Sequence, residues 1–576
     1  MPTAATAVAH EIRDPLLQER AVDGLLHSLL GEDPVTAQKA TCDAISGIVG
    51  SDQPTPAELD ALLSLELHAQ QTSGELLKRY VDGDGALRAF NLQDWIAALR
   101  LSKKFYQGYE RMLRHTQQTS DHYWLAHAHF VVVRMFHHRQ VEFLLRFIRF
   151  KKRIPGQWKE IHEAYKYALM RGIAMHSIAG DDDSREAATT LEQQYIRLLL
   201  LEVINNGQFA PRDALWADAW FSRWARMLRL EWRETNGGVR ITNRGFVVDI
   251  DGTDGLRRTG TVTPRNPLHL DPTPLQALFD KELATLTSAE ASHDASTHAE
   301  RAGKIALLRK LSGIYAPVSV RVIRRGEREP VALSIQMVTG LSSIIQILRE
   351  EAGRHAAPAA MAEPRAEEIA VSPLGLSTDF PAMPTTDGAG LARTTGGGPS
   401  ATAQQAWQLR DRSESGARLR GQIDDLNRII PGSLVAIRER ADAPWTISVV
   451  RRFRRLMVNF VEIGVEHLGR RPSVVKIVAK PSAQGSAPGE YANGRFVALY
   501  LPPSESQPVM PIRTLLLPAR KFDADGRITL LSSNSTHTLR LNEPIQQQFE
   551  YLWASFTVVD SGSIAEGAKA VAAAHP

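Results

Sequence analysis

The chain has 576 residues, of which 43% are hydrophobic and 23% charged, and its formal net charge is +4. This length is enough for about three or four domains, each with a core of its own. The composition is that of a soluble protein and excludes a fibrous or membrane-embedded chain. So small a positive excess does not argue for a nucleic-acid partner, and we expect neither DNA nor RNA binding.

The single cysteine, Cys42, excludes an internal disulfide framework and favours a reducing compartment. Residues 1–14 lack the charged and then apolar pattern of a signal peptide. No stretch reaches the roughly 18 uninterrupted apolar residues of a membrane span. We therefore expect a cytoplasmic protein without a membrane span.

Residues 1–232 have a helical pattern, because apolar residues recur at spacings of three and four. They predict an all-α domain, an antiparallel array that is either a degenerate tetratricopeptide-type repeat or a plain bundle. The predicted helices cover residues 16–30, 57–67, 94–113, 123–150, 158–175, 191–204 and 214–230.

Five histidines between residues 122 and 138 raise the question of a metal site. No His-Glu-x-x-His spacing occurs and no cysteine joins them, so we expect no metal and histidines that are solvated or at the edge of the core. These five are His122, His127, His129, His137 and His138.

Residues 233–315 predict a β-hairpin followed by a helical connector, with helices near 274–286 and 299–311. The run from Asp249 to Thr253 looks like the first motif of haloacid-dehalogenase-type phosphatases. That likeness implies a nucleophile at Asp249 and a general acid/base at Asp251. The following residues have no alternation of strands and helices, so we favour a polar hairpin turn. A Mg²⁺-dependent phosphatase remains an alternative.

Three arginines, Arg324, Arg325 and Arg328, follow a predicted strand at residues 318–321 and precede an apolar run over 331–348. A guanidinium group presents a planar fork of donors that fits a phosphate or the O6/N7 edge of guanine. Arg321 with Arg325, or Arg324 with Arg328, forms an Arg-x-x-x-Arg pattern, and we prefer the second. A solvated basic turn is the plainer alternative.

The stretch from Trp407 to Leu419 predicts strand, turn and strand, since apolar and polar residues alternate before a small-residue turn. Asp411 and Ser413 are two residues apart and point to one face of an extended chain. A carboxylate and a hydroxyl there could bind one edge of a planar ligand. We expect Gly416 to allow a turn with positive φ.

Arg-x-x-x-Arg followed by Asp-x-Ser-x-x-Gly resembles the PilZ domain, the bacterial receptor module for cyclic di-GMP. Residues 461–466 also resemble the closing strand of that domain. The resemblance implies an antiparallel β-barrel formed by residues 316–348 and 405–480. It places the arginines on phosphates and guanine edges, Asp411 and Ser413 on a guanine base, and Gly416 in the turn. It implies no catalysis and no cofactor other than the ligand.

The resemblance departs from the family at residues 349–404, which separate the two motifs where the family has a short interval. This segment is rich in Ala, Pro, Thr and Gly, so we predict a disordered linker. Loop-closure entropy rises only logarithmically with length, so the insertion costs on the order of 1 kcal/mol.

Residues 481–560 predict a second small β module, with a core strand at 515–518 and a helix near 546–553, before a flexible tail at 561–576. The predicted fold class is therefore multidomain α+β. We expect a cyclic di-GMP receptor whose helical domain binds an unidentified protein. The rival is a scaffold whose degenerate barrel has lost the ligand.

Overall fold

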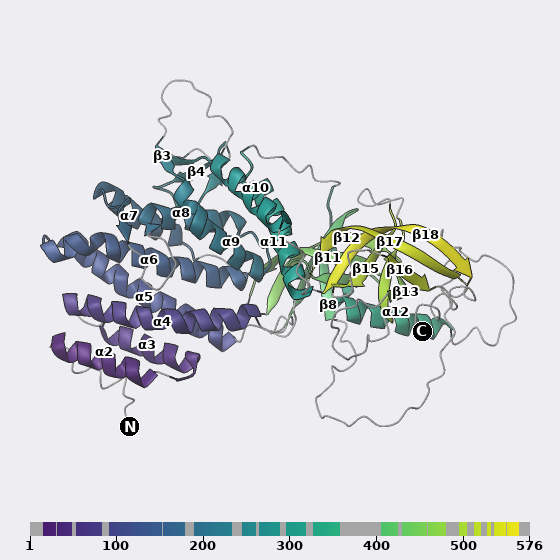
Figure 1. Cartoon of the computed structure of the whole chain (residues 1–576), viewed down its shortest axis with the longest axis horizontal. Coiled ribbons are helices and arrows are strands. Elements are labelled where there is room, and N and C mark those ends of the chain that lie inside the picture. The colour runs from purple at the N-terminus through teal and green to yellow at the C-terminus, as the bar shows by residue number, and fades with distance from the viewer. Residues whose placement is uncertain are drawn as a thin grey trace, which may run out of the picture. The chain divides into compact units, whose positions relative to one another are not determined.

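The computed structural model divides the chain into two compact units, and its elements are shown in Figure 1. Unit 1 comprises residues 1–289 and 304–322, and unit 2 comprises residues 290–303 and 323–576. The structure describes residues 15–29, 31–48, 53–82, 92–151, 154–178, 189–232, 245–260, 264–288, 295–317, 327–356, 405–423, 429–457, 459–479, 495–503, 512–519, 527–531, 535–548 and 550–563.

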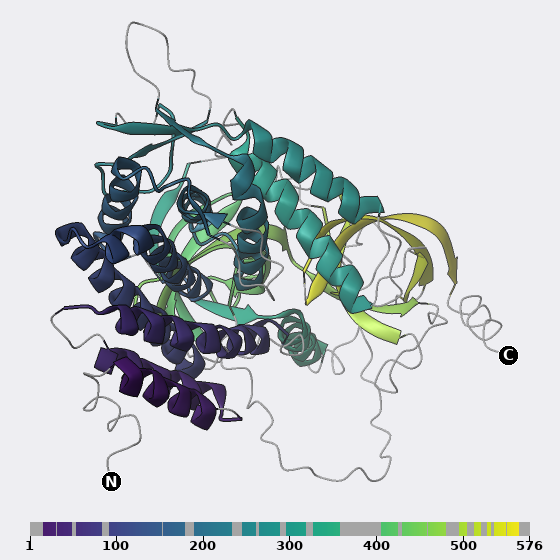
Figure 2. The ribbon, with the colours of Figure 1, turned by 60° about the vertical axis from the view of Figure 1, so that its left-hand side comes forward.

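Helices dominate unit 1, and their apolar faces form one continuous core. Helices α2 to α9 lie side by side, and the views in Figures 1 and 2 agree that α2 and strand β3 lie at opposite ends of this stack. The helices are α2 (Pro15–Leu29), α3 (Pro34–Ile48), α4 (Pro56–Asp82), α5 (Leu92–Gln118), α6 (His122–Ile148), α7 (Gln157–Met170), α8 (Leu191–Ile204) and α9 (Pro211–Trp224), with a 3-10 turn η1 (Ala225–Met227) after α9.

The prediction that the N-terminal region is mainly helical is confirmed, but three small strands interrupt the helices. Strand β1 (Ser177–Ile178) pairs with β2 (Thr189–Thr190), and β3 (Leu230–Trp232) joins a later sheet. Helix α3 was not predicted. Its sequence is mostly small and polar residues, so its apolar periodicity is weak.

The segment after residue 232 packs into the same core as the helices. Its sheet has the order β3-β6-β4-β5, and all three pairings are antiparallel. Phe246, Leu275 and Tyr315 are buried with the side chains of α8 and α9. The elements are β4 (Phe246–Asp249), β5 (Arg257–Arg258), β6 (Pro267–Leu270), α10 (Thr273–Ser288) and α11 (Ala295–Tyr315).

Unit 2 contains two closed, six-stranded antiparallel barrels. Numbered along the chain within each barrel, the strands have the same circular order: first, second, third, sixth, fifth, fourth. The first barrel comprises β7 (Glu329–Thr339), β8 (Gln405–Ser413), β9 (Gly416–Gln422), β10 (Leu434–Arg438), β11 (Thr446–Arg455) and β12 (Phe460–Arg470). The second comprises β13 (Ser473–Ala479), β14 (Arg495–Leu501), β15 (Thr514–Pro518), β16 (Arg527–Leu531), β17 (Ser535–Gln547) and β18 (Tyr551–Ser563).

The predicted apolar run over 331–348 divides into a strand and a helix. Gly340, with φ of 85°, ends β7 and allows the chain to turn into α12 (Leu341–Ala356). Helix α12 contributes Ile344 and Ile347 to a core shared with Leu434 of the first barrel and Leu516 of the second. The linker predicted from residue 349 therefore overlaps the last two turns of α12.

Two further expectations about the barrels are wrong. Residues 473–479, which we assigned to the first barrel, form β13 of the second. The helix expected near 546–553 is instead the end of β17 and the start of β18, which pair antiparallel across a register shift at Pro544. Closing the barrel requires these apolar residues in a strand, and this tertiary requirement overrides their local pattern. The strand predicted at 318–321 and the predicted tail beyond 563 lie outside the described residues.

Within the described ranges, no helix has both the length and the apolar character needed to cross a bilayer.

Candidate functional site

The two sequence motifs meet in the first barrel because β7 and β8 pair antiparallel. Their register places Glu329 opposite Arg412 and Pro330 opposite Asp411. Arg328 lies one residue before β7, and its Nη1 donates to Asp411 Oδ1 at 2.8 Å. The two strands that flank the insertion are thus direct neighbours in the barrel. Arg324 and Arg325 lie outside the described residues.

A β-bulge determines which face of the barrel Asp411 occupies. The pairing of β8 with β9 shifts between Leu409 and Asp411. Leu409 is opposite Leu419 and both are buried, whereas Asp411 is opposite Arg418. Strand residues alternate between faces, so the shift directs Asp411 outward and Arg412 toward the barrel mouth.

Asp411 is only 4% exposed, although it carries a carboxylate on the outer face. Arg328 covers one of its oxygens and Arg418 forms an ion pair with the other. Both arginine side chains are about half exposed, at 51% and 44%. Each guanidinium has five N–H donors, so both keep donors directed at solvent. This arrangement presents two cations held side by side by one carboxylate.

The turn after Asp411 is a two-residue hairpin of Glu414 and Ser415. Ser413 pairs with Gly416 across it, and the Ser413 hydroxyl donates to the Gly416 carbonyl oxygen at 3.2 Å. Ser413 and Asp411 come from one short segment of β8, but this hydroxyl is engaged with the backbone of its own hairpin.

We expected Gly416 to be required for a turn with positive φ, and this reason is wrong. Gly416 is not among the glycines with positive φ. A Cβ atom at this position would instead lie 2.2 Å from the Val465 carbonyl oxygen of β12. Glycine is required here by the close approach of a neighbouring strand, and a distant part of the chain creates that requirement.

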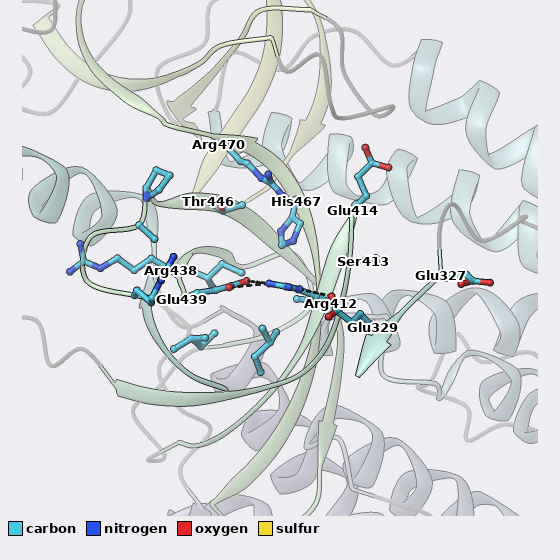
Figure 3. Close-up of a pocket in the computed structure, with 17 residues that line it drawn as sticks. Glu327, Glu329, Arg412, Ser413, Glu414, Arg438, Glu439, Thr446, His467 and Arg470 are labelled. Carbon is cyan, nitrogen blue, oxygen red and sulfur yellow. Dashed lines mark hydrogen bonds and ion pairs between the residues drawn. The ribbon is translucent and has the colours of Figure 1, made fainter. Parts of the chain in front are cut away.

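The barrel mouth next to this hairpin holds a cavity of about 520 Å³, shown in Figure 3. Arg412 spans it: its Nε donates to Glu329 at 3.0 Å and its Nη1 donates to both oxygens of Glu439 at 3.0 Å. These hydrogen bonds and charges raise the pKa of Arg412. Strands β7 and β8 are thereby linked across the mouth to the residue that follows β10.

His467 and Arg438 line the inner side of the same cavity. His467 Nδ1 lies 2.9 Å from the Ser448 hydroxyl, and burial, assisted by the charge of Arg470, lowers the pKa of His467 to about 4. Arg438 donates to Glu351 of α12 at 2.7 Å, which connects the cavity wall to the helix between the barrels.

The aspartates of the phosphatase alternative have structural roles in unit 1. Asp249 accepts hydrogen bonds from the backbone N–H groups of Asp251, Arg265 and Asn266 at 3.0 to 3.2 Å. Asp251 receives Lys166 Nζ at 2.8 Å, and this contact lowers the pKa of Asp251. The pair organises a turn in an antiparallel sheet, whereas the phosphatase family uses a parallel one.

The five histidines that we expected to be solvated or at the edge of the core lie along α6. His122 is exposed, whereas His138 is buried with its Nε2 2.9 Å from Glu66 Oε1. Burial raises the pKa of Glu66, but His138, Arg134 and His137 outweigh it and lower that pKa to about 2. Among the described residues, no group of three His, Cys, Asp or Glu side chains could hold a metal ion.

Sequence reasoning missed Arg418 and Arg412. Both lie within or next to the Asp-x-Ser-x-x-Gly segment, and Arg418 occupies the polar position opposite Asp411 in the hairpin. The pairing of Arg418 with Asp411 could be predicted from the two-residue turn alone. The position of Arg412 could not be predicted, because it depends on the bulge.

Residues 20–235 match a family model described as the N-terminal domain of the cyclic-di-GMP receptor FimW. The match covers less than half of the chain and lies in unit 1, so both barrels fall outside it. No curated protein and no solved structure matches the chain.

Proposed function

We propose that this protein is a cyclic di-GMP receptor and that the ligand binds to a PilZ-type first barrel, through Arg324, Arg325 and Arg328 and the hairpin 411–416. The similarity of residues 20–235 to the N-terminal domain of a cyclic-di-GMP receptor supports the ligand class. The contact between Arg328 and Asp411 carries the choice of site, because it joins two motif halves that are 83 positions apart.

The chemistry of the site suits a cyclic dinucleotide with two phosphates and two guanines. Arg328 and Arg418 offer exposed guanidinium groups, and Arg324 and Arg325 precede Arg328 by a few residues. An arginine fork can donate to phosphate oxygens or to the O6/N7 edge of guanine. The Asp411 carboxylate accepts hydrogen bonds, so the N–H edge of a guanine can take the place of one arginine there. Ser413 supplies a hydroxyl group nearby.

Binding would transfer Arg328 from Asp411 to the ligand and order the arginine segment against the barrel. Ordering of a segment by a charged ligand is an established kind of switch. The helical domain is the part that contacts a protein partner, and receptor action needs neither a cofactor nor catalysis. A chain with one cysteine suits the cytoplasm, where we place it.

Isothermal titration calorimetry of the full chain with cyclic di-GMP tests this proposal. We expect a dissociation constant below about 1 μM for the wild type and a loss of at least about 100-fold in Arg324→Ala/Arg328→Ala. Arg495→Ala, an exposed arginine of the second barrel, is the matched control and should bind like the wild type. No heat from folded wild-type protein would overturn the receptor and favour the ligand-free scaffold.

A further inference from the structure

Helices α3 and α5 form a groove of about 560 Å³ on unit 1, far along the chain from the barrel motifs. Its apolar lining residues include Val35 from α3 and Ile96 from α5, and Cys42 lies between charged residues on α3. Arg100 and Gln107 lie along the α5 side, seven residues or about 10 Å apart. The groove therefore extends along roughly two helical turns.

Among the described residues, four cations line this groove against a single carboxylate. Lys39 comes from α3, and Arg100, Lys103 and Lys104 come from α5, whereas Asp43 is the one acidic residue of this described lining. Other arginines of the unit, such as Arg139 and Arg197, form ion pairs with buried carboxylates. Across the described ranges, none of these four cations has a carboxylate within ion-pair distance. Their charge is available to an anionic partner.

Apolar side chains line the groove beside these charges, namely Val35, Ile96 and Ala97. Burial and the charge of Asp43 raise the pKa of the Cys42 thiol to about 12, and the opposing effects of Lys104 and Arg100 do not reverse this. Cys42 is therefore a neutral thiol, which behaves as a small hydrophobic side chain. An apolar lining beside charged residues matches an amphipathic helix, which presents an apolar face flanked by polar residues.

The lining also distinguishes between anionic partners. Among the described residues that line the groove there is no aromatic ring, so they offer no surface on which a nucleobase could stack. The cations on α5 recur at positions 100, 103 and 104, which matches the spacing of acidic side chains along a facing helix. We propose that the α3–α5 groove binds an acidic amphipathic helix of a partner protein.

This inference rests on the part of the proposed function that assigns partner binding to the helical domain. It is independent of cyclic di-GMP binding, since the groove lies in unit 1 and the proposed ligand site lies in unit 2. Complementary charge would determine the partner's orientation and its rate of association, and the apolar lining residues would supply the buried contact.

The test uses a labelled synthetic helix with leucine on one face and glutamate on the other, titrated into the full chain by fluorescence anisotropy. A peptide with lysine in place of glutamate and a single-stranded oligonucleotide serve as comparison probes. Cys42 supplies a second measurement, because it is the only cysteine of the chain and its labelling rate reports on access to the groove. The labelling uses excess maleimide in alkaline buffer, since the raised pKa of this thiol leaves little thiolate at neutral pH.

We expect the acidic peptide to bind, to slow Cys42 labelling several-fold, and to lose at least about tenfold in affinity in Lys39→Glu/Arg100→Glu/Lys103→Glu. Lys281→Glu, on the exposed face of α10, should change neither measurement. Binding should weaken with salt. The inference is overturned if Cys42 is not protected, if charge reversal has no effect, or if the oligonucleotide binds more tightly. Unchanged calorimetry with cyclic di-GMP in the triple variant separates this result from failure of the receptor proposal.

Discussion

Arg328 donates to Asp411 at 2.8 Å, although these residues are separated by 83 positions that include a whole helix and a long insertion. The contact is possible because the insertion begins and ends on neighbouring antiparallel strands. The family resemblance and the strand pairing thus converge on the same pair of side chains.

A double-mutant cycle on this pair tests whether they act together on the ligand. We expect Arg328→Ala and Asp411→Ala each to weaken cyclic di-GMP binding, and the double variant to be little worse than the poorer single one. The expected coupling free energy is about 1 kcal/mol, since substitutions of two residues in contact do not have additive effects on the binding free energy. Calorimetry at constant salt measures it. Arg328→Ala combined with Arg420→Ala is the control pair, because Arg420 is paired with Glu462; additive effects in both cycles would contradict a shared site.

Gly416→Ala should destabilise the first barrel by about 2 kcal/mol. The new Cβ would meet the Val465 carbonyl oxygen at 2.2 Å, and backbone cannot move aside as a side chain can. Urea unfolding gives the change in free energy. Gly464→Ala is the matched control on the adjacent strand, because its Cβ would lie 3.5 Å from Arg452, an ordinary contact. Equal effects of the two substitutions would contradict the close-approach explanation.

Glu66→Ala should destabilise the helical unit by about 3 kcal/mol, because it leaves an imidazole, a guanidinium and a hydroxyl partner without their acceptor. Those partners are His138, Arg134 and Tyr109. Thermal unfolding followed by far-ultraviolet circular dichroism checks this. Glu110→Ala removes only an ion pair with the largely exposed Arg114 and should change stability by less than about 0.5 kcal/mol.

The lowered pKa of His467 predicts that the stability of the first barrel depends on pH. Its folded-state pKa is about 4, below the ordinary 6.5, so the unfolded state binds the proton more readily. The contribution of His467 to stability is complete above pH 6.5 and is lost as the pH falls from 6.5 toward 4. Hydrogen exchange of β12 peptides across this range measures the effect. In His467→Gln the slope between these pH values should be smaller, and an unchanged slope would refute the assignment.

Asp249→Asn should alter stability and not turnover. Asp249 holds three backbone N–H groups of its turn, and an amide oxygen accepts them less strongly than a carboxylate does. In the presence of Mg²⁺, wild type and variant should release phosphate from p-nitrophenyl phosphate at the same background rate. Mg²⁺-dependent release that disappears in the variant would support the phosphatase alternative.

The sequence predicted the long helices well, because α5, α6 and α8 carry sustained apolar periodicity within one chain segment. It did not predict α12. The apolar residues of α12 continue those of β7, and only Gly340 marks the boundary. The barrel strands were recognised where alternation was clear, and their grouping into two barrels depends on pairings between distant segments.

The candidate site was predictable only in part. Asp411 and Ser413 were placed on one strand by the motif, and Arg418 could have been found from the hairpin. The burial of Asp411 and the position of Arg412 follow from a bulge that appears only when β8 pairs with β9. The requirement for Gly416 comes from β12, about fifty residues later, and no local pattern reports it.

The two barrels share one circular strand order but differ at the connection after their second strand. In the second barrel, β14 and β15 occupy the places of β8 and β9, and residues 502–513 stand between them where the first barrel has two residues. The same barrel topology therefore accommodates connections of very different length at this point. The compact turn beside Asp411 is accordingly not a requirement of the barrel itself.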